Sequence, residues 1–110
     1  MLVSIVIPVF NESKTIFEIL KKVNEIKDFN KEIIIINDGS TDNTKEIIKK
    51  NCSNLYSKFI TYKENKGKGH ACRKGLMQVE GQIVIIQDAD LEYDPNDYSK
   101  LIEPIIKKKS

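Results

Sequence analysis

The hydrophobic residues of this chain fall into short runs separated by segments with helical spacing. Runs of four to six apolar residues are typical of strands buried within a parallel sheet. Three of the four runs have this character, whereas the third in chain order alternates with polar residues and predicts a more exposed strand. The four predicted strands span residues 2–7, 32–36, 58–63 and 82–87.

Between these runs, apolar residues recur every three or four positions and predict amphipathic helices. The predicted helices span about 13–27, 42–51 and 69–79, and a fourth begins at Asp94-Pro95. Pro8 is expected to end the first strand, and Gly81 to cap the third helix. The cluster 37–42 supplies turn and N-cap residues for the second helix.

This alternation predicts an α/β fold with a parallel sheet, right-handed crossovers and helices on both faces. Such sheets bind ligands beyond the carboxyl ends of their strands. Three polar clusters are expected there, at residues 8–12, 37–40 and 88–92. The sequence therefore predicts one binding site built from several loops.

With 110 residues, the chain is long enough for one small domain with a core. A formal net charge of +2 gives no indication of nucleic-acid binding. Cys52 and Cys72 are interpreted as reduced thiols, with Cys72 a small core residue on a helix. Neither a signal peptide nor a span of roughly 20 apolar residues is apparent, which favours a soluble protein of the cytoplasm or the cytoplasmic face of the membrane.

An acid pair directly follows the fourth predicted strand. Asp88 and Asp90 are two residues apart, a spacing that places side chains on the same side of an extended backbone. Two carboxylates at one point favour a divalent cation such as Mg²⁺, which takes oxygen ligands and substrate phosphates. Glu92 could provide a third oxygen. The alternative is that these are ordinary turn acids.

Other polar residues at the same edge each have two interpretations. Asp38 either accepts hydrogen bonds from a nucleotide or caps a helix, and Glu12 either lines the site or begins a helix. Lys68, within the segment 66–69, could face phosphates. That segment does not fit a P-loop, and no G-x-G-x-x-G follows the first strand. His70 is better explained as a helix-surface residue than as a catalytic one, and no zinc-ligand spacing occurs.

Together these segments resemble the amino-terminal half of family 2 glycosyltransferases of GT-A fold, and most of all the dolichyl- or polyprenyl-phosphate sugar transferases. Asn37 stands where the family usually has an acid. The resemblance rests on residues 3–12, 36–42, 65–69 and 87–95.

The resemblance implies specific roles for these residues. Asp38, with Ile36 beside it, would recognise the base of a UDP- or GDP-linked sugar, and Asp88 and Asp90 would be the catalytic acids. Mg²⁺ or Mn²⁺ would be held by Asp90 and Glu92, with Asp88 nearby. The full implied binding set is Pro8, Phe10, Glu12, Ile36, Asp38, Lys68, Asp88, Ala89 and Asp90.

The resemblance covers only the donor-binding part of such an enzyme, so residues 1–110 are expected to be one domain, either a fragment of a longer catalytic unit or a truncated relative. The acceptor would be a lipid phosphate or a glycan, with membrane contact only through that acceptor or a missing carboxyl-terminal part. Apolar surface that should face the missing half would be exposed. Two alternatives are a non-catalytic nucleotide-binding module and a receiver-like regulatory domain, which would need an acid pair after the first strand.

Overall fold

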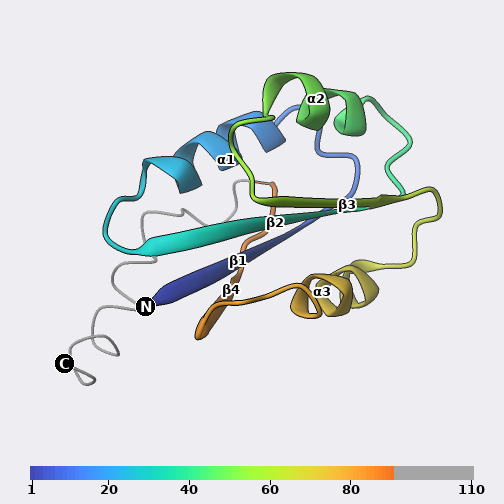
Figure 1. The fold of residues 1–110 in the computed structure, drawn as a ribbon. Helices are drawn as coiled ribbons and strands as arrows, with labels where there is room; N and C mark the ends of the chain where they lie inside the picture. The colour runs from blue at the N-terminus through green and yellow to red at the C-terminus, as the bar shows by residue number, and fades with distance from the viewer. Residues whose placement is uncertain (91–110) are drawn as a thin grey trace.

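The computed structural model describes residues 1–90 and shows a four-stranded sheet with every neighbouring pair parallel (Figure 1). The strand order is β3-β2-β1-β4, so the first two strands in the chain occupy the centre. The central strands, Leu2–Val9 and Asn30–Asp38, each contain one of the apolar runs, and their middle residues are fully buried. The strands are β1 (Leu2–Val9), β2 (Asn30–Asp38), β3 (Lys58–Tyr62) and β4 (Ile83–Ile86).

Helices cover both faces of the sheet, as the alternation of elements predicts. In Figure 1, α1 (Ile16–Glu25) and α2 (Thr44–Asn51) lie on one face and α3 (Lys68–Leu76) on the other. The pleat divides the apolar residues between these layers. The larger core cluster includes Ile5, Ile35 and residues of α1 and α2, and the smaller one joins Val6, Ile36 and Ala71 beneath α3.

Strand β4 differs from its prediction as a strand buried on both faces. It forms an edge of the described sheet and alternates in burial: Ile83 and Ile85 pack against the larger core, while Val84 and Ile86 are 37% and 46% exposed. An apolar run looks the same whether a strand is central or at an edge, so the sequence could not distinguish them. Two apolar side chains of this strand, Val84 and Ile86, are thus exposed.

Strand β1 continues through Pro8, although proline was expected to end it. The last pair between β1 and β4 joins Val6 to Ile86, and the Val6 carbonyl accepts a hydrogen bond from the Gln87 N–H. The Pro8 nitrogen points toward β4, as the Val6 carbonyl does, but it lies two residues beyond the last β1–β4 pair. Its missing N–H therefore removes no ladder hydrogen bond.

Helix α3 ends at Leu76, earlier than predicted, so Gly81 does not cap it. Gly81 is needed for a different reason: a Cβ there would lie 2.6 Å from the Leu2 carbonyl oxygen. The prediction for Cys72 also needs correction, because this α3 residue is only half-buried, whereas Cys52 is fully buried. Both cysteines are free thiols.

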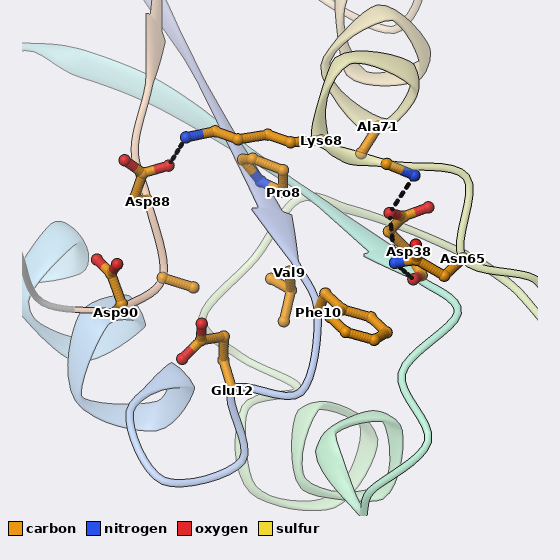
Figure 2. A pocket seen from close by; sticks show the side chains of 12 residues that line it. Pro8, Val9, Phe10, Glu12, Asp38, Asn65, Lys68, Ala71, Asp88 and Asp90 are labelled. Atoms are coloured by element: carbon orange, nitrogen blue, oxygen red, sulfur yellow. Dashed lines mark hydrogen bonds and ion pairs between the residues drawn. The ribbon is translucent and has the colours of Figure 1, made fainter.

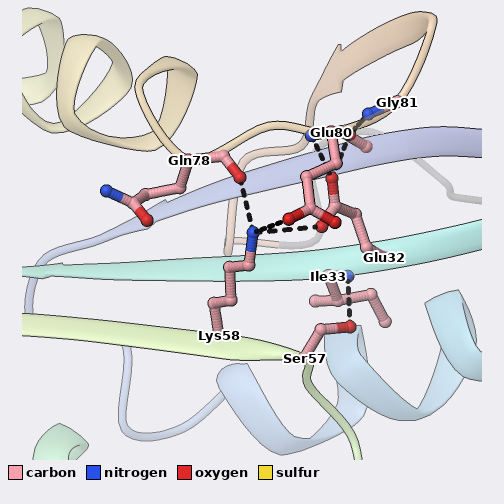
Figure 3. Close-up of polar contacts among 8 residues, drawn as sticks. Glu32, Ile33, Ser57, Lys58, Gln78, Glu80 and Gly81 are labelled. Atoms are coloured by element: carbon pink, nitrogen blue, oxygen red, sulfur yellow. Dashed lines mark hydrogen bonds and ion pairs between the residues drawn. The ribbon is translucent and has the colours of Figure 1, made fainter.

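Polar residues at the amino ends of the strands form a packed cluster around Glu32, shown in Figure 3. Glu32 Oε2 accepts hydrogen bonds from the Ser4 hydroxyl (2.5 Å) and the Glu80 N–H (2.6 Å). Lys58 Nζ lies 3.6 Å from Glu32 Oε1 and 3.5 Å from Glu80 Oε1. This amino-end cluster ties the segment between α3 and β4 to the central strands.

Within residues 1–90, no helix combines the length and apolar character needed to cross a membrane. The predicted helix from Asp94 and the predicted metal ligand Glu92 lie outside the described residues.

Candidate functional site

A cavity of about 460 Å³ opens at the carboxyl ends of the strands (Figure 2). This volume lies within the roughly 300–1,000 Å³ of small-molecule sites. Its walls come from the carboxyl ends of β1 and β2, from the segments that follow β1, β3 and β4, and from the start of α3. The lining residues are Pro8, Val9, Phe10, Glu12, Asp38, Asn65, Gly67, Lys68, Ala71, Asp88, Ala89 and Asp90.

Asn11 joins the loops that follow β1 and β2. Its backbone adopts a positive φ of 53°, which asparagine tolerates better than most residues. Its Oδ1 accepts hydrogen bonds from the N–H groups of Thr41 (2.8 Å) and Asp42 (3.3 Å), and its own N–H donates to the Ser40 hydroxyl at 2.9 Å. These bonds hold the backbone that carries Phe10 and Glu12 into the cavity wall.

Glu12 is connected in turn to the fourth strand's loop through Thr15. The Thr15 hydroxyl lies 3.1 Å from Glu12 Oε2 and also donates to the Ala89 carbonyl oxygen. On its other side, the Glu12 N–H donates to the Thr44 hydroxyl at 3.1 Å. Glu12 therefore has both predicted features: its carbonyl accepts the Ile16 N–H at 2.9 Å, where α1 begins, and the residue lines the cavity.

Asp38 is a buried acid of the cavity wall that accepts hydrogen bonds from four donors. Oδ1 accepts from the Tyr62 hydroxyl (2.6 Å) and the Lys66 N–H (2.9 Å), and Oδ2 from the Asn65 amide (3.0 Å) and the Gly67 N–H (2.9 Å). The residue is only 2% exposed. Burial, with the hydrogen bond and charge of Asp38, raises the pKa of Tyr62. Asp38 therefore fixes the segment between β3 and α3.

Close contact at Gly39 explains why that position lacks a side chain. A Cβ there would lie 2.3 Å from the Asn65 backbone nitrogen, and the φ of +66° is one that side chains rarely adopt. The loop after β2 and the loop after β3 can thus approach each other closely enough for Asp38 to reach its four donors.

Lys68 and Asp88 face each other across the cavity in Figure 2. Lys68, the first residue of α3, donates to Asp88 Oδ1 in an ion pair. The hydrogen bond to Asp88 raises the pKa of Lys68 despite some burial, and the charge of Asp90 adds to the effect. The ammonium thus offsets negative charge from both acids.

The sequence comparisons give the family. A family model described as glycosyl transferase family 2 matches residues 4–110. The chain belongs to glycosyl transferase family 2. The poly-beta-1,6-N-acetyl-D-glucosamine synthase of Staphylococcus aureus strain COL is 43% identical over 94 residues, which are 86% of this chain and 23% of that protein. The chain therefore spans about a quarter of the length of this curated relative.

Solved structures of related enzymes share the fold. Residues 1–349 of Staphylococcus aureus TarS match with a TM-score of 0.79 and 28% identity, over 98% of this chain and 33% of that solved fragment. The Pyrobaculum calidifontis mannosyltransferase PcManGT, solved with GDP-Man and Mn²⁺, matches with a TM-score of 0.74 and 29% identity over 80% of this chain and 27% of its own. Glucosyl-3-phosphoglycerate synthase of Mycobacterium tuberculosis, solved with Mn²⁺, UDP and glucosyl-3-phosphoglycerate, matches with a TM-score of 0.76. Its identity is 26%, over 94% of this chain and 39% of its own. The predicted GT-A architecture is confirmed.

Protein side chains among the described residues could supply only some of the ligands of a divalent cation in this family 2 chain. Residues 1–90 contain no group of three or more histidine, cysteine or acidic side chains able to hold a metal. Asp88 and Asp90 nevertheless line the same cavity. Two carboxylates are enough to hold Mg²⁺ or Mn²⁺ when substrate phosphates provide the remaining oxygen ligands. The acids are not placed by the pleat of β4, since that strand ends at Ile86 and Asp90 lies in a turn.

Most of the predicted binding residues of the family 2 site lie together. Eight line the cavity, namely Pro8, Phe10, Glu12, Asp38, Lys68, Asp88, Ala89 and Asp90. Ile36 does not, because it lies one pleat deeper than Asp38 and is fully buried under α3. His70 packs edge-on against Tyr62, with ring centroids 5.6 Å apart, rather than lining the cavity.

Four lining residues were not predicted as site residues: Val9, Asn65, Gly67 and Ala71. Asn65 and Gly67 belong to the segment 65–69 that carried part of the resemblance, so their proximity to Lys68 was an available signal. Ala71 follows one helical turn after Lys68 on the same face of α3.

Proposed function

We propose that this chain forms the donor-binding part of a glycosyltransferase that transfers a sugar from a nucleoside diphosphate to an acceptor with the help of Mg²⁺ or Mn²⁺. The observation that carries the proposal is one cavity at the carboxyl ends of parallel strands that brings Asp88, Asp90 and Lys68 together. An acid pair suits a divalent cation and an ammonium suits a diphosphate, so one ligand would satisfy both groups.

Different residues of the cavity wall would bind different parts of the nucleotide-sugar donor. Phe10, exposed at the cavity mouth beside Pro8, offers an apolar face to a base. Lys68 would bind diphosphate oxygens, and Asp88 and Asp90, with Glu92, would hold the metal ion. When bound, the cation supplies Lewis-acid stabilisation of the leaving diphosphate.

Asp38 was predicted to read the base, and the structure provides a constraint on that role. A carboxylate has about four acceptor positions, and all four are used within the protein. We therefore propose that Asp38 positions the wall that meets the base, and contacts the base itself only if one of these bonds opens.

The acceptor is proposed from relatives. The Staphylococcus aureus relative is named a poly-beta-1,6-N-acetyl-D-glucosamine synthase, which favours a glycan hydroxyl. A polyprenyl phosphate remains the second candidate, and its anionic oxygen would need less help from a general base.

Calorimetric titration of UDP, GDP and their sugars, with and without Mn²⁺, tests the proposal. We expect metal-dependent binding that Asp90→Ala weakens at least about tenfold through loss of a ligand. Glu25→Ala is the matched control, since Glu25 is an exposed acid at the far end of α1. Binding that is equal with and without Mn²⁺, and unaffected by Asp90→Ala, would contradict the metal assignment.

Transfer itself is measured on the chain with whatever sequence follows it, using radiolabelled sugar and both acceptor classes. Incorporation into a glycan or into polyprenyl phosphate decides between them. Tight donor binding with no transfer to either acceptor would instead support the alternative of a non-catalytic nucleotide-binding module.

A further inference from the structure

The pair between Lys68 and Asp88 joins the two sides of the cavity that would receive opposite parts of a donor. Lys68 belongs to the start of α3, and Asp88 follows β4. The Lys68 side chain is 61% exposed while that of Asp88 is 23% exposed. The lysine is thus free to leave toward solvent, whereas the acid stays against the cavity wall.

The position of Lys68 at the start of α3 favours a negative partner. A cation in the first turn of a helix faces the positive end of the helix dipole, and this first turn contains no acidic residue. Asp88 and Asp90 need a positive charge nearby, because neighbouring carboxylates repel each other unless a cation lies close. The ion pair relieves both costs at once.

Several hydrogen bonds fix the backbone just before Lys68, whereas its side chain is held by the ion pair with Asp88. Asp38 accepts the N–H groups of Lys66 and Gly67, and the Asn65 amide as well. The base of the lysine is therefore fixed at the cavity wall, and a flexible four-carbon stem carries the ammonium. A change of partner would need rotation of that stem only.

We propose that, before donor and metal bind, the Lys68 ammonium pairs with Asp88 at the position that the divalent cation would take. When donor and metal bind, Lys68 leaves Asp88 and pairs with the donor diphosphate instead. This inference rests on the proposed function. Lys68 therefore has opposite effects on two affinities. It weakens binding of the metal ion alone, and it strengthens binding of the metal ion together with a nucleoside diphosphate.

The test measures these two affinities separately on the full chain. Binding of Mn²⁺ alone is followed by the electron paramagnetic resonance signal of free Mn²⁺, and binding of UDP and GDP by calorimetry at saturating Mn²⁺. Lys68→Gln should bind Mn²⁺ alone about threefold to tenfold more tightly, because the competing charge is gone. It should bind the preferred nucleotide about tenfold more weakly, because a charge-assisted bond to phosphate is lost.

Lys66→Gln is the matched control, since it removes one positive charge from the same loop outside the cavity lining. We expect it to change either affinity by less than about twofold at physiological salt. Opposite changes in Lys68→Gln alone support the exchange.

Two results overturn the inference, and they differ in what else they affect. If wild type binds Mn²⁺ with nucleotide but Lys68→Gln leaves the affinity for Mn²⁺ alone unchanged, the exchange is wrong and the proposed function stands. If wild type binds neither UDP nor GDP with Mn²⁺, the proposed function fails and the inference with it.

Discussion

The two ends of the sheet both bring an acid and a lysine together, yet they differ in how completely the acid is enclosed. At the amino end, Glu32 is 7% exposed and accepts hydrogen bonds from two other segments besides its lysine. At the carboxyl end, Asp88 pairs with an exposed lysine beside a cavity. An acid–lysine pair is therefore a structural bond where protein donors surround the acid, and a candidate site where room for a ligand remains.

Asp38 shows that position at the carboxyl end is not enough. It lines the same cavity as Asp88 but resembles Glu32 in its burial and in its number of partners. The comparison predicts that stability depends on Asp38 and Glu32, whereas binding depends on Asp88. The variants below test that division in order of their expected effect on the free energy of unfolding.

Asp38→Ala should have the largest effect, a loss of about 3–4 kcal/mol, because four donors lose their acceptor in a buried site. Urea denaturation measures it. Tyr62→Phe, which removes one of the four donors, is the matched control and should cost about 1 kcal/mol. A loss below about 1 kcal/mol in Asp38→Ala would instead favour the direct role in base recognition.

Glu32→Ala should cost about 2–3 kcal/mol, since the Ser4 hydroxyl, the Glu80 N–H and Lys58 all lose a buried acceptor. Glu80→Ala is the matched control because Glu80 pairs with the same lysine but its side chain is 72% exposed. We expect this control to cost less than about 0.5 kcal/mol. Equal losses in the two variants would show that enclosure does not decide the value of the pair.

The amino-end cluster should also make stability depend on pH. Burial raises the pKa of Glu32, but hydrogen bonds from Ser4 and Glu80 and the charge of Lys58 together hold it below its ordinary value. Its contribution is therefore complete above the ordinary carboxyl range and is lost as pH falls through the lowered pKa.

Glu32→Gln removes this titration, so its unfolding free energy should fall less steeply below about pH 4.5, by up to about 1.4 kcal/mol per pH unit. Chemical denaturation from pH 6 to pH 3 measures the difference between the two proteins. Asp42, whose pKa is also lowered by hydrogen bonds from Thr44 and Ser13 against the effect of burial, keeps its own acid dependence in both. Parallel curves would contradict the assignment to Glu32.

The sequence was sufficient to predict the central strands and the edge of the sheet at which the cavity opens. The buried runs of β1 and β2 and the polar segments after them identify the carboxyl-end loops, because parallel strands end at one edge. The sequence did not predict that Asp38 accepts four hydrogen bonds within the protein, because its donors lie 24 to 29 positions away along the chain. The edge position of β4 and the depth of Ile36 depend likewise on which elements pack beside them, and a local pattern does not contain that information.

The smallest effect on stability is expected for Asp88→Asn, the counterpart at the carboxyl end of Glu32→Gln. Both variants remove one charge beside a lysine and keep the shape of the side chain. Because Lys68 is mostly exposed, its ion pair is screened by water, and Asp88→Asn should change the free energy of unfolding by less than about 0.5 kcal/mol. Binding of a nucleoside diphosphate with Mn²⁺ should nevertheless weaken by about tenfold or more, as for loss of a metal ligand or its support. The free energy of unfolding and calorimetric binding are measured on the same preparation. A loss of stability in Asp88→Asn as large as that in Glu32→Gln would show that Asp88 is a structural acid, and that the two ends of the sheet do not differ in this respect.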